Sequence, residues 1–169
     1  MNKTVNIKRI ATLGLLLAYA MILSYIESLI PFFGGVPGMK LGLPNMVIVL
    51  LIYNYGMGSG IVINLLRILL TGLLFGSMFG IMFSASGAVI SFLVMVAVKK
   101  INIFDIRGVS ICGGISHNIA QLLIAAFFVK TSGIMYYLPL LLISGALTGF
   151  LNGIIAGIML KYLKYMQLL

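Results

Sequence analysis

The sequence predicts an all-α integral membrane protein, a bundle of six transmembrane helices that forms a single domain over residues 1–169. Hydrophobic residues make up 62% of the chain and charged residues only 8%, with a mean hydropathy of +1.23. A soluble domain of this length carries far more charge. Long apolar runs, separated by short stretches of Gly, Pro and basic residues, supply the helices.

The apolar runs give the elements in chain order. We expect spans near residues 10–33, 43–56, 59–76, 79–98, 109–129 and 137–160. The first is long enough to cross the roughly 30 Å hydrocarbon layer, and no clean small-x-small site follows it, so we interpret it as a helix rather than a signal peptide. The second, "LPNMVIVLLIYNYG", is shorter than the roughly twenty residues of a perpendicular span. It is therefore predicted to be short or irregular.

Charge indicates the partner and the orientation. Eleven Lys and Arg against two acidic residues give a net charge of +9, which by itself could indicate a nucleic-acid binder. The basic residues stand singly or in pairs between apolar runs, so we expect a lipid bilayer and no nucleic acid as partner. With both termini in the cytoplasm, the cytoplasmic side receives Lys3, Lys8, Arg9, Lys99, Lys100, Arg107, Lys161 and Lys164. The outer side receives Lys40 and Lys130.

Small residues recur at helical spacing. The chain has twenty glycines, and the rows are Gly14 with Ala18, Gly72 with Gly76 and Gly80, and Gly145 with Gly149, Gly153 and Gly157. Such rows let helix backbones approach closely. We interpret most of them as packing surfaces within the bundle.

Polar residues within the spans are the candidate site, because an ionisable group in a membrane is costly unless it is paired or reaches water. We predict one polar site, open to the outside, from Glu27, Lys40, Asn45, Arg67, His117, Asn118 and Gln121. His117 and Gln121, four residues apart, share a helix face, while Asn118 turns toward a neighbouring helix.

A packing role is the alternative. Glu27 and Arg67 would then form an interhelical ion pair, and the polar residues of the fifth span would only join helices. Each residue alone fits both interpretations equally, but the set on one side of the membrane favours a ligand site. If Glu27 pairs with Arg67, Lys40 and His117 are surplus donors, which suits an anionic or acceptor-rich ligand.

Catalytic signatures are missing from the sequence. It has no GxxxxGK[ST] motif, and two acidic residues cannot build a two-magnesium carboxylate site. Cys112 and His117 do not make a zinc site, and no nucleophile with a base is visible. We therefore expect no enzyme activity, no cofactor and no metal. Asp105 and Arg107 are expected to pair locally.

Six stretches carry a family resemblance: "LSYIESLIP", "GMKLGLPN", "NLLRILLTG", "SASGAVISFLVM", "GVSICGGISHNIAQL" and "YLPLLLISGALTGFLNG". Together they resemble the bacterial Gx transporter family, also labelled heptaprenyl diphosphate synthase component I. That family is similar to the S components of energy-coupling factor (ECF) transporters. The resemblance implies an S-component-like bundle in the bacterial cytoplasmic membrane, which takes a small vitamin- or precursor-like substrate from the outer face.

The resemblance also implies partners. S components associate with a transmembrane coupling subunit and two ATPase subunits, docking through small residues of the first helix. Ala11, Gly14 and Ala18 stand where such a row lies, with Gly14 as the departure from an alanine row.

Two other functions compete with this one. The chain could be an accessory membrane partner in isoprenoid, quinone or flavin-linked redox metabolism that transports nothing. An autonomous secondary transporter would need inverted repeats, and we see none.

Overall fold

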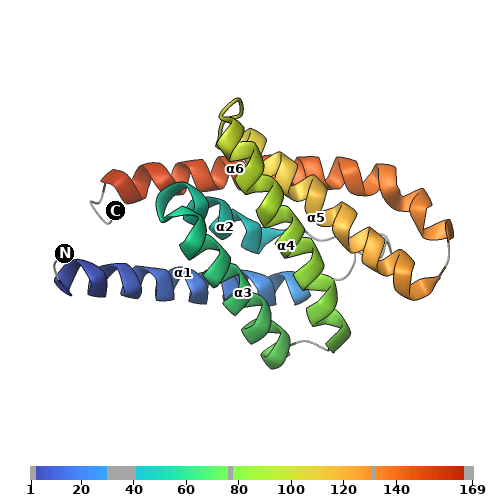
Figure 1. Ribbon diagram of the computed structural model, residues 1–169, viewed down its shortest axis with the longest axis horizontal. Coiled ribbons are helices and arrows are strands. Elements are labelled where there is room, and N and C mark those ends of the chain that lie inside the picture. Colours follow the sequence, from blue (N-terminus) through green and yellow to red (C-terminus); the bar gives the residue numbers. More distant parts are fainter. Residues whose placement is uncertain (1–2, 30–40, 76–77, 131, 166–169) are drawn as a thin grey trace.

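The protein is a bundle of six α-helices (Figure 1). The computed structural model describes residues 3–29, 41–75, 78–130 and 132–165. Its helices are α1 Lys3–Leu29, α2 Leu43–Asn54, α3 Gly56–Phe75, α4 Met78–Ile101, α5 Ile106–Val129 and α6 Leu138–Tyr165. A short 3-10 helix, η2 (Ser132–Tyr137), precedes α6. No strand occurs in these ranges, so the all-helical prediction is confirmed.

Five helices are long and apolar enough to span a membrane. These spans are Ile7–Leu29, Gly56–Phe75, Gly80–Ile101, Ile106–Val129 and Gly133–Tyr165. The protein is therefore a multi-pass membrane protein. Whether the short α2 counts as a sixth crossing, and which side each end faces, stay predictions.

Helix α2 is short, as predicted, because it is an interior helix. It has 12 residues, and every residue from Pro44 to Ile52 is buried. Its central sequence "VIVLLI" has no polar face, so it can be covered on all sides. Helices α1, α3, α4, α5 and α6 all contact it. The bundle is thus built around α2, whose hydrophobic side chains form its main core.

Two glycines frame α2. Gly42, before its first residue, has a left-handed φ of 63°, and Gly56, at the start of α3, has a φ of 84°. Glycine adopts this conformation without the penalty that a Cβ brings. Only Tyr55 separates α2 from α3, so the chain reverses there almost at once.

Helices α5 and α6 pack backbone against backbone along the glycine row of α6. A methyl group added at Gly149 would lie 2.6 Å from the Ser110 carbonyl oxygen, and one at Gly153 would lie 2.7 Å from the Arg107 Cα. Neither distance is possible for a real side chain. The packing interpretation is therefore confirmed for this row.

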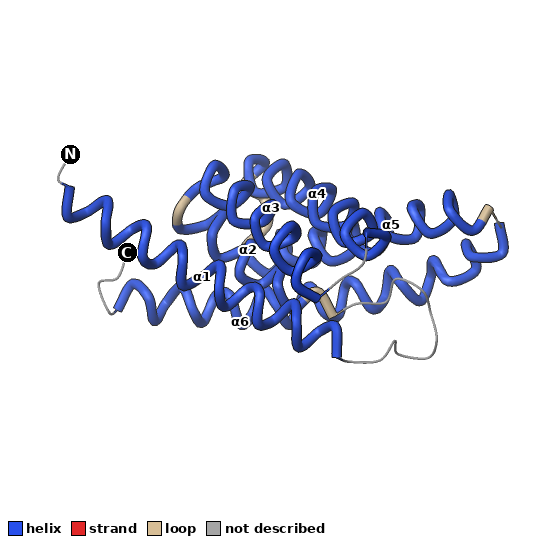
Figure 2. Tube along the Cα trace, turned by 90° about the horizontal axis from the view of Figure 1, so that it is seen from below, coloured by secondary structure: helices blue, strands red, loops and turns tan. Residues whose placement is uncertain are grey.

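The start of α1 and the end of α6 lie at the same end of the bundle (Figures 1 and 2). Two cations near this end donate to carbonyls at the end of α2 and just beyond it. Lys99 Nζ donates to the Ile52 carbonyl oxygen at 2.6 Å, and Arg9 Nη2 donates to the Tyr55 carbonyl oxygen at 3.2 Å. The final carbonyls of a helix have no partner within it, and cations there also complement the helix dipole.

Local hydrogen bonds stabilise the connection between α4 and α5. Asp105 caps α5 by accepting from Gly108 N at 3.0 Å, and Arg107 Nε donates to its other oxygen at 2.7 Å. The expected pairing of Asp105 with Arg107 is confirmed. The hydrogen bond from Gly108, followed by that from Arg107, holds the pKa of Asp105 below its ordinary value.

Candidate functional site

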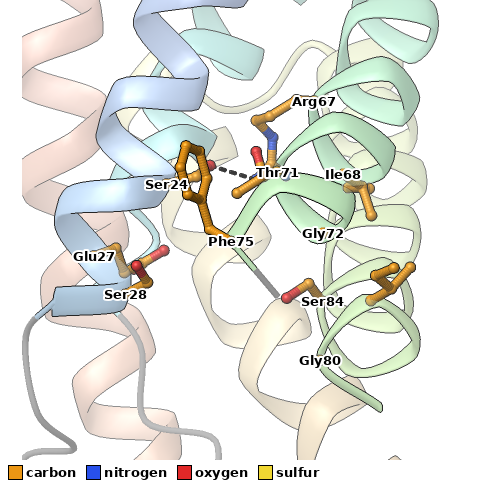
Figure 3. Close-up of a pocket in the computed structure, with 11 residues that line it drawn as sticks. Ser24, Glu27, Ser28, Arg67, Ile68, Thr71, Gly72, Phe75, Gly80 and Ser84 are labelled. Atoms are coloured by element: carbon orange, nitrogen blue, oxygen red, sulfur yellow. Dashed lines mark hydrogen bonds between the residues drawn. The ribbon is translucent and has the colours of Figure 1, made fainter. Parts of the chain in front are cut away.

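A cavity with both charged and apolar residues in its wall lies between α1, α3 and α4 (Figure 3). Its volume is about 480 Å³, within the range of small-molecule sites. Its walls are formed by Ser24, Glu27, Ser28, Arg67, Ile68, Thr71, Gly72, Phe75, Gly80, Ile81 and Ser84. Glu27 is near the end of α1, Phe75 ends α3 and Gly80 lies near the start of α4. The cavity therefore lies toward the end of the bundle opposite the start of α1.

Arg67 is the buried cation of this cavity, with 7% of its surface exposed. Its Nη1 donates to Ser24 Oγ at 3.1 Å and its Nη2 to Asn64 Oδ1 at 2.9 Å. Ser24 Oγ donates in turn to the Ala20 carbonyl, which directs a lone pair toward the guanidinium. Two neutral oxygens thus hold Arg67 in place without neutralising its charge.

Two polar atoms at this wall lack a hydrogen-bond partner among the described residues: Arg67 Nε and Thr71 Oγ1. Both belong to α3, four residues apart on one face. Burying an arginine in a membrane costs about 2.5–3.5 kcal/mol on insertion scales. A membrane protein retains such a residue where it meets a ligand, a partner or water.

Glu27 provides the negative charge of the cavity and links it to α2. The Gly42 amide donates to Glu27 Oε1 at 2.5 Å. The Gly42 carbonyl accepts from the side-chain Nδ2 of Asn152 in α6 at 3.0 Å and from the backbone N–H of Asn45 at 2.9 Å. The first turn of α2 is thereby fixed between a carboxylate of α1 and an amide of α6.

A second polar cluster lies inside α2, α5 and α6. Asn45 Nδ2 and His117 Nδ1 are 3.5 Å apart, and Asn152 reaches the Leu41 carbonyl at 3.3 Å. The space among these residues, Asn118 and Thr148 is only about 10 Å³, which is room for about one water molecule. The cluster leaves no room for a ligand, and we call it the closed cluster.

Asn118 joins α5 to α6, as the sequence predicted. Its Nδ2 donates to the Leu141 carbonyl at 2.9 Å and to Ser144 Oγ at 3.2 Å. On the other face of α5, His117 and Gln121 lie against Gly87 of α4, because a methyl group there would be within 3.0 Å of both. Gln121 is fully buried, and neither amide atom has a partner among the described residues.

Among the described residues, the predicted site residues thus fall into two groups. Glu27 and Arg67 line the cavity, whereas Asn45, His117 and Asn118 surround the closed space, with Gln121 next to His117. Gly42 connects the groups. Lys40 lies outside the described residues.

Sequence reasoning missed Ser24, Thr71 and Asn152 as site residues. Ser24 precedes Glu27 by three positions and Thr71 follows Arg67 by four, so helical spacing from each charge would have found both. Asn152 gave no such signal, because its position depends on how α6 packs against the start of α2. Across the described residues, no three His, Cys, Asp or Glu side chains gather in a way that could hold a metal ion.

These features define a class: a multi-pass helical membrane protein with a ligand-sized cavity between three of its helices. A family model fits this class. Heptaprenyl diphosphate synthase component I matches residues 16–159, and the chain belongs to this family. Neither the curated proteins nor the solved structures gave a match.

Proposed function

We propose that the protein is a membrane substrate-binding and translocating subunit that resembles the S component of an ECF transporter. It takes up a small vitamin- or precursor-like ligand with an anionic group from the outer face of the bacterial cytoplasmic membrane. The observation that carries this proposal is the cavity of about 480 Å³ with Arg67 buried in its wall. A guanidinium held by neutral oxygens is suited to a carboxylate or phosphate.

The residues of the cavity and those of the closed cluster would bind the ligand one after the other. The ligand first occupies the cavity beside Arg67 and Glu27. A shift of α2 then brings Asn45, His117, Asn118 and Gln121 into contact with it. Gly42 supports this link, because its amide contacts Glu27 and its carbonyl contacts Asn152 of the closed cluster.

The exposed face of α1 supports docking to a transmembrane coupling subunit that carries two ATPases. Ala11, Gly14 and Ala18 are all exposed, and a methyl group at Gly14 would meet nothing within 4 Å. The buried stripe of α1, formed by Leu16, Ala20 and Ser24, lies on another face. The small residues are therefore not used for packing among the described residues.

A second candidate is a non-catalytic membrane component that works with a prenyl diphosphate synthase, a partner to which the family description points, or with redox proteins. The chain would then transport nothing. Because its sequence has only two acidic residues, we propose that the synthase label describes an accessory role rather than catalysis.

Native mass spectrometry of the gently purified protein tests the cavity. We expect a small molecule bound to the wild type that is lost in Arg67→Ala and retained in Arg107→Ala, a control that removes an arginine outside the cavity. His117→Ala tests whether the closed cluster contributes. An adduct that survives Arg67→Ala, or no adduct on any form, would contradict the proposed site.

Copurification separates the two candidate functions. The tagged protein is extracted in mild detergent and its partners are identified by mass spectrometry. A coupling subunit with an ATPase pair is the expected result. A prenyltransferase or redox proteins in their place would favour the second candidate.

A further inference from the structure

We propose that the cavity between α1, α3 and α4 takes an amphoteric molecule, one that presents an anionic group to Arg67 and a cationic or hydrogen-donating group to Glu27. This inference rests on the proposed function and narrows its substrate class. It predicts a ligand that is close to neutral overall and has both kinds of group.

Charge balance is the first argument. Of the described residues that line the cavity, Arg67 and Glu27 are the two that ionise, and their charges have opposite signs. Bringing a net charge into a membrane interior is costly, whereas a ligand with both signs adds none. A purely anionic ligand would be attracted by Arg67 but repelled by Glu27. A purely cationic ligand would be attracted by Glu27 but repelled by Arg67.

Geometry is the second argument. Ser24, which accepts from Arg67, precedes Glu27 by three residues on one face of α1. Residues at this spacing have Cβ atoms about 5–6 Å apart. Figure 3 shows Glu27 one turn beyond Ser24, toward the end of α1. The two binding groups of the ligand should therefore be separated by a few bonds.

The rest of the lining is the third argument. Ser24, Ser28, Thr71 and Ser84 bring hydroxyl groups, which can both donate and accept. Ile68, Ile81 and Phe75 bring apolar surface, and the Phe75 ring packs on Tyr25 with ring centroids 4.7 Å apart. This lining suits a compact ligand with a short apolar or planar body between its polar groups.

A thermal-shift screen by charge class tests the proposal. The probes are three size-matched sets of small compounds: carboxylates and phosphate monoesters, amines, and compounds that carry both groups. The protein is held in phosphatidylglycerol nanodiscs, and unfolding is followed by the reaction of Cys112 with a thiol-reactive fluorophore. Cys112 is the single cysteine and is partly buried in α5, so the fluorophore reports on one position. The chain has no tryptophan whose fluorescence could serve instead.

We expect the amphoteric set to raise Tm and the single-charge sets to bind about tenfold more weakly or worse. Glu27→Gln should shift the preference toward anions, and Arg67→Gln should remove anion binding. Arg67→Lys keeps the charge and serves if Arg67→Gln does not fold. Asp105→Asn and Arg107→Gln are the matched controls, because they neutralise charges outside the cavity, and they should bind as the wild type does.

The experiment distinguishes a failure of the amphoteric class from a failure of the proposed function. Anions that bind the wild type, respond to Arg67→Gln and ignore Glu27→Gln would overturn the amphoteric class but leave the proposed function standing. No stabilisation by any class would overturn both. Phosphatidylethanolamine added to the nanodiscs tests a lipid headgroup as source. Stabilisation by this lipid, lost in both variants, would support the amphoteric chemistry and contradict uptake of a soluble substrate.

Discussion

Two buried polar side chains, Arg67 and Gln121, both have atoms without a hydrogen-bond partner among the described residues, but their surroundings differ. Arg67 lines a cavity, where a ligand or water can reach the guanidinium group. Gln121 is packed between helices and is 0% exposed. An unpaired amide in such a place costs roughly 1–3 kcal/mol. The two residues should therefore respond oppositely to replacement.

Replacing Gln121 with a residue of similar shape should stabilise the empty protein. We expect Gln121→Met to raise Tm, since it removes two unpaired polar atoms at nearly constant volume, for a gain of about 1–3 kcal/mol. Asn118→Leu is the control, because Asn118 is paired with α6, and its loss should lower stability by roughly 0.6–1.7 kcal/mol. Thermal unfolding in detergent measures both. A loss of stability in Gln121→Met equal to that in the control would refute the idea.

At the scale of single elements, the glycines of this chain have different structural roles. Those of α6 are contact points between backbones, whereas Gly14 of α1 faces open space. The same residue type at the same spacing therefore has opposite tolerance to substitution.

Substitution by alanine separates these two kinds of glycine. Gly149→Ala should lower stability by about 1–3 kcal/mol, because the added methyl meets the rigid backbone of α5. Gly14→Ala should be neutral or stabilising by up to about 1 kcal/mol, since alanine favours the helix and nothing is displaced. Parallel melting curves of the two variants decide the matter, and equal effects would contradict this packing.

The end of α2 gives a second prediction at this scale. Lys99→Met should lower stability by about 1 kcal/mol, because the Ile52 carbonyl loses its charged donor. Lys100→Met is the matched control, as Lys100 is exposed at the neighbouring position. If the two variants melt alike, the contact of Lys99 with α2 contributes nothing measurable.

Element boundaries and the site were predictable to different extents. Six helices, the short second one and the use of the α6 glycine row as a packing surface all follow from local patterns of apolar and small residues. The division of the polar residues into two groups does not, because it depends on α2 lying between them. Sequence spacing shows which residues share a helix face, as with His117 and Gln121, but not which helix lies opposite.

At the scale of the whole molecule, α1 differs from its neighbours. Its buried stripe is narrow, formed by Leu16, Ala20 and Ser24, and much of its remaining surface is exposed. By contrast, α5 and α6 touch along their backbones. The bundle thus has a tightly packed pair, α5 and α6, and a helix with few buried residues, α1. A helix with so much exposed surface fits a role in binding a partner.

A bulky residue on the small-residue face of α1 tests this role. We expect Gly14→Leu to abolish copurification of the coupling subunit while Tm changes little, because nothing in the described bundle occupies that space. Leu147→Trp, at an exposed position of α6, is the control. Retention of the partner by Gly14→Leu would argue against docking through this face.

The burial of α2 has a consequence for biogenesis. Twelve residues of helix span about 18 Å, too little to cross a bilayer of about 30 Å unaided. Its cover includes α6, which is synthesised after α1 to α5, and Asn152 of α6 holds its first turn. The core therefore cannot close before α6 has been synthesised. Chains truncated after residue 130 should be inserted but degraded quickly in pulse-chase experiments, and coexpressing residues 131–169 as a separate piece should protect them.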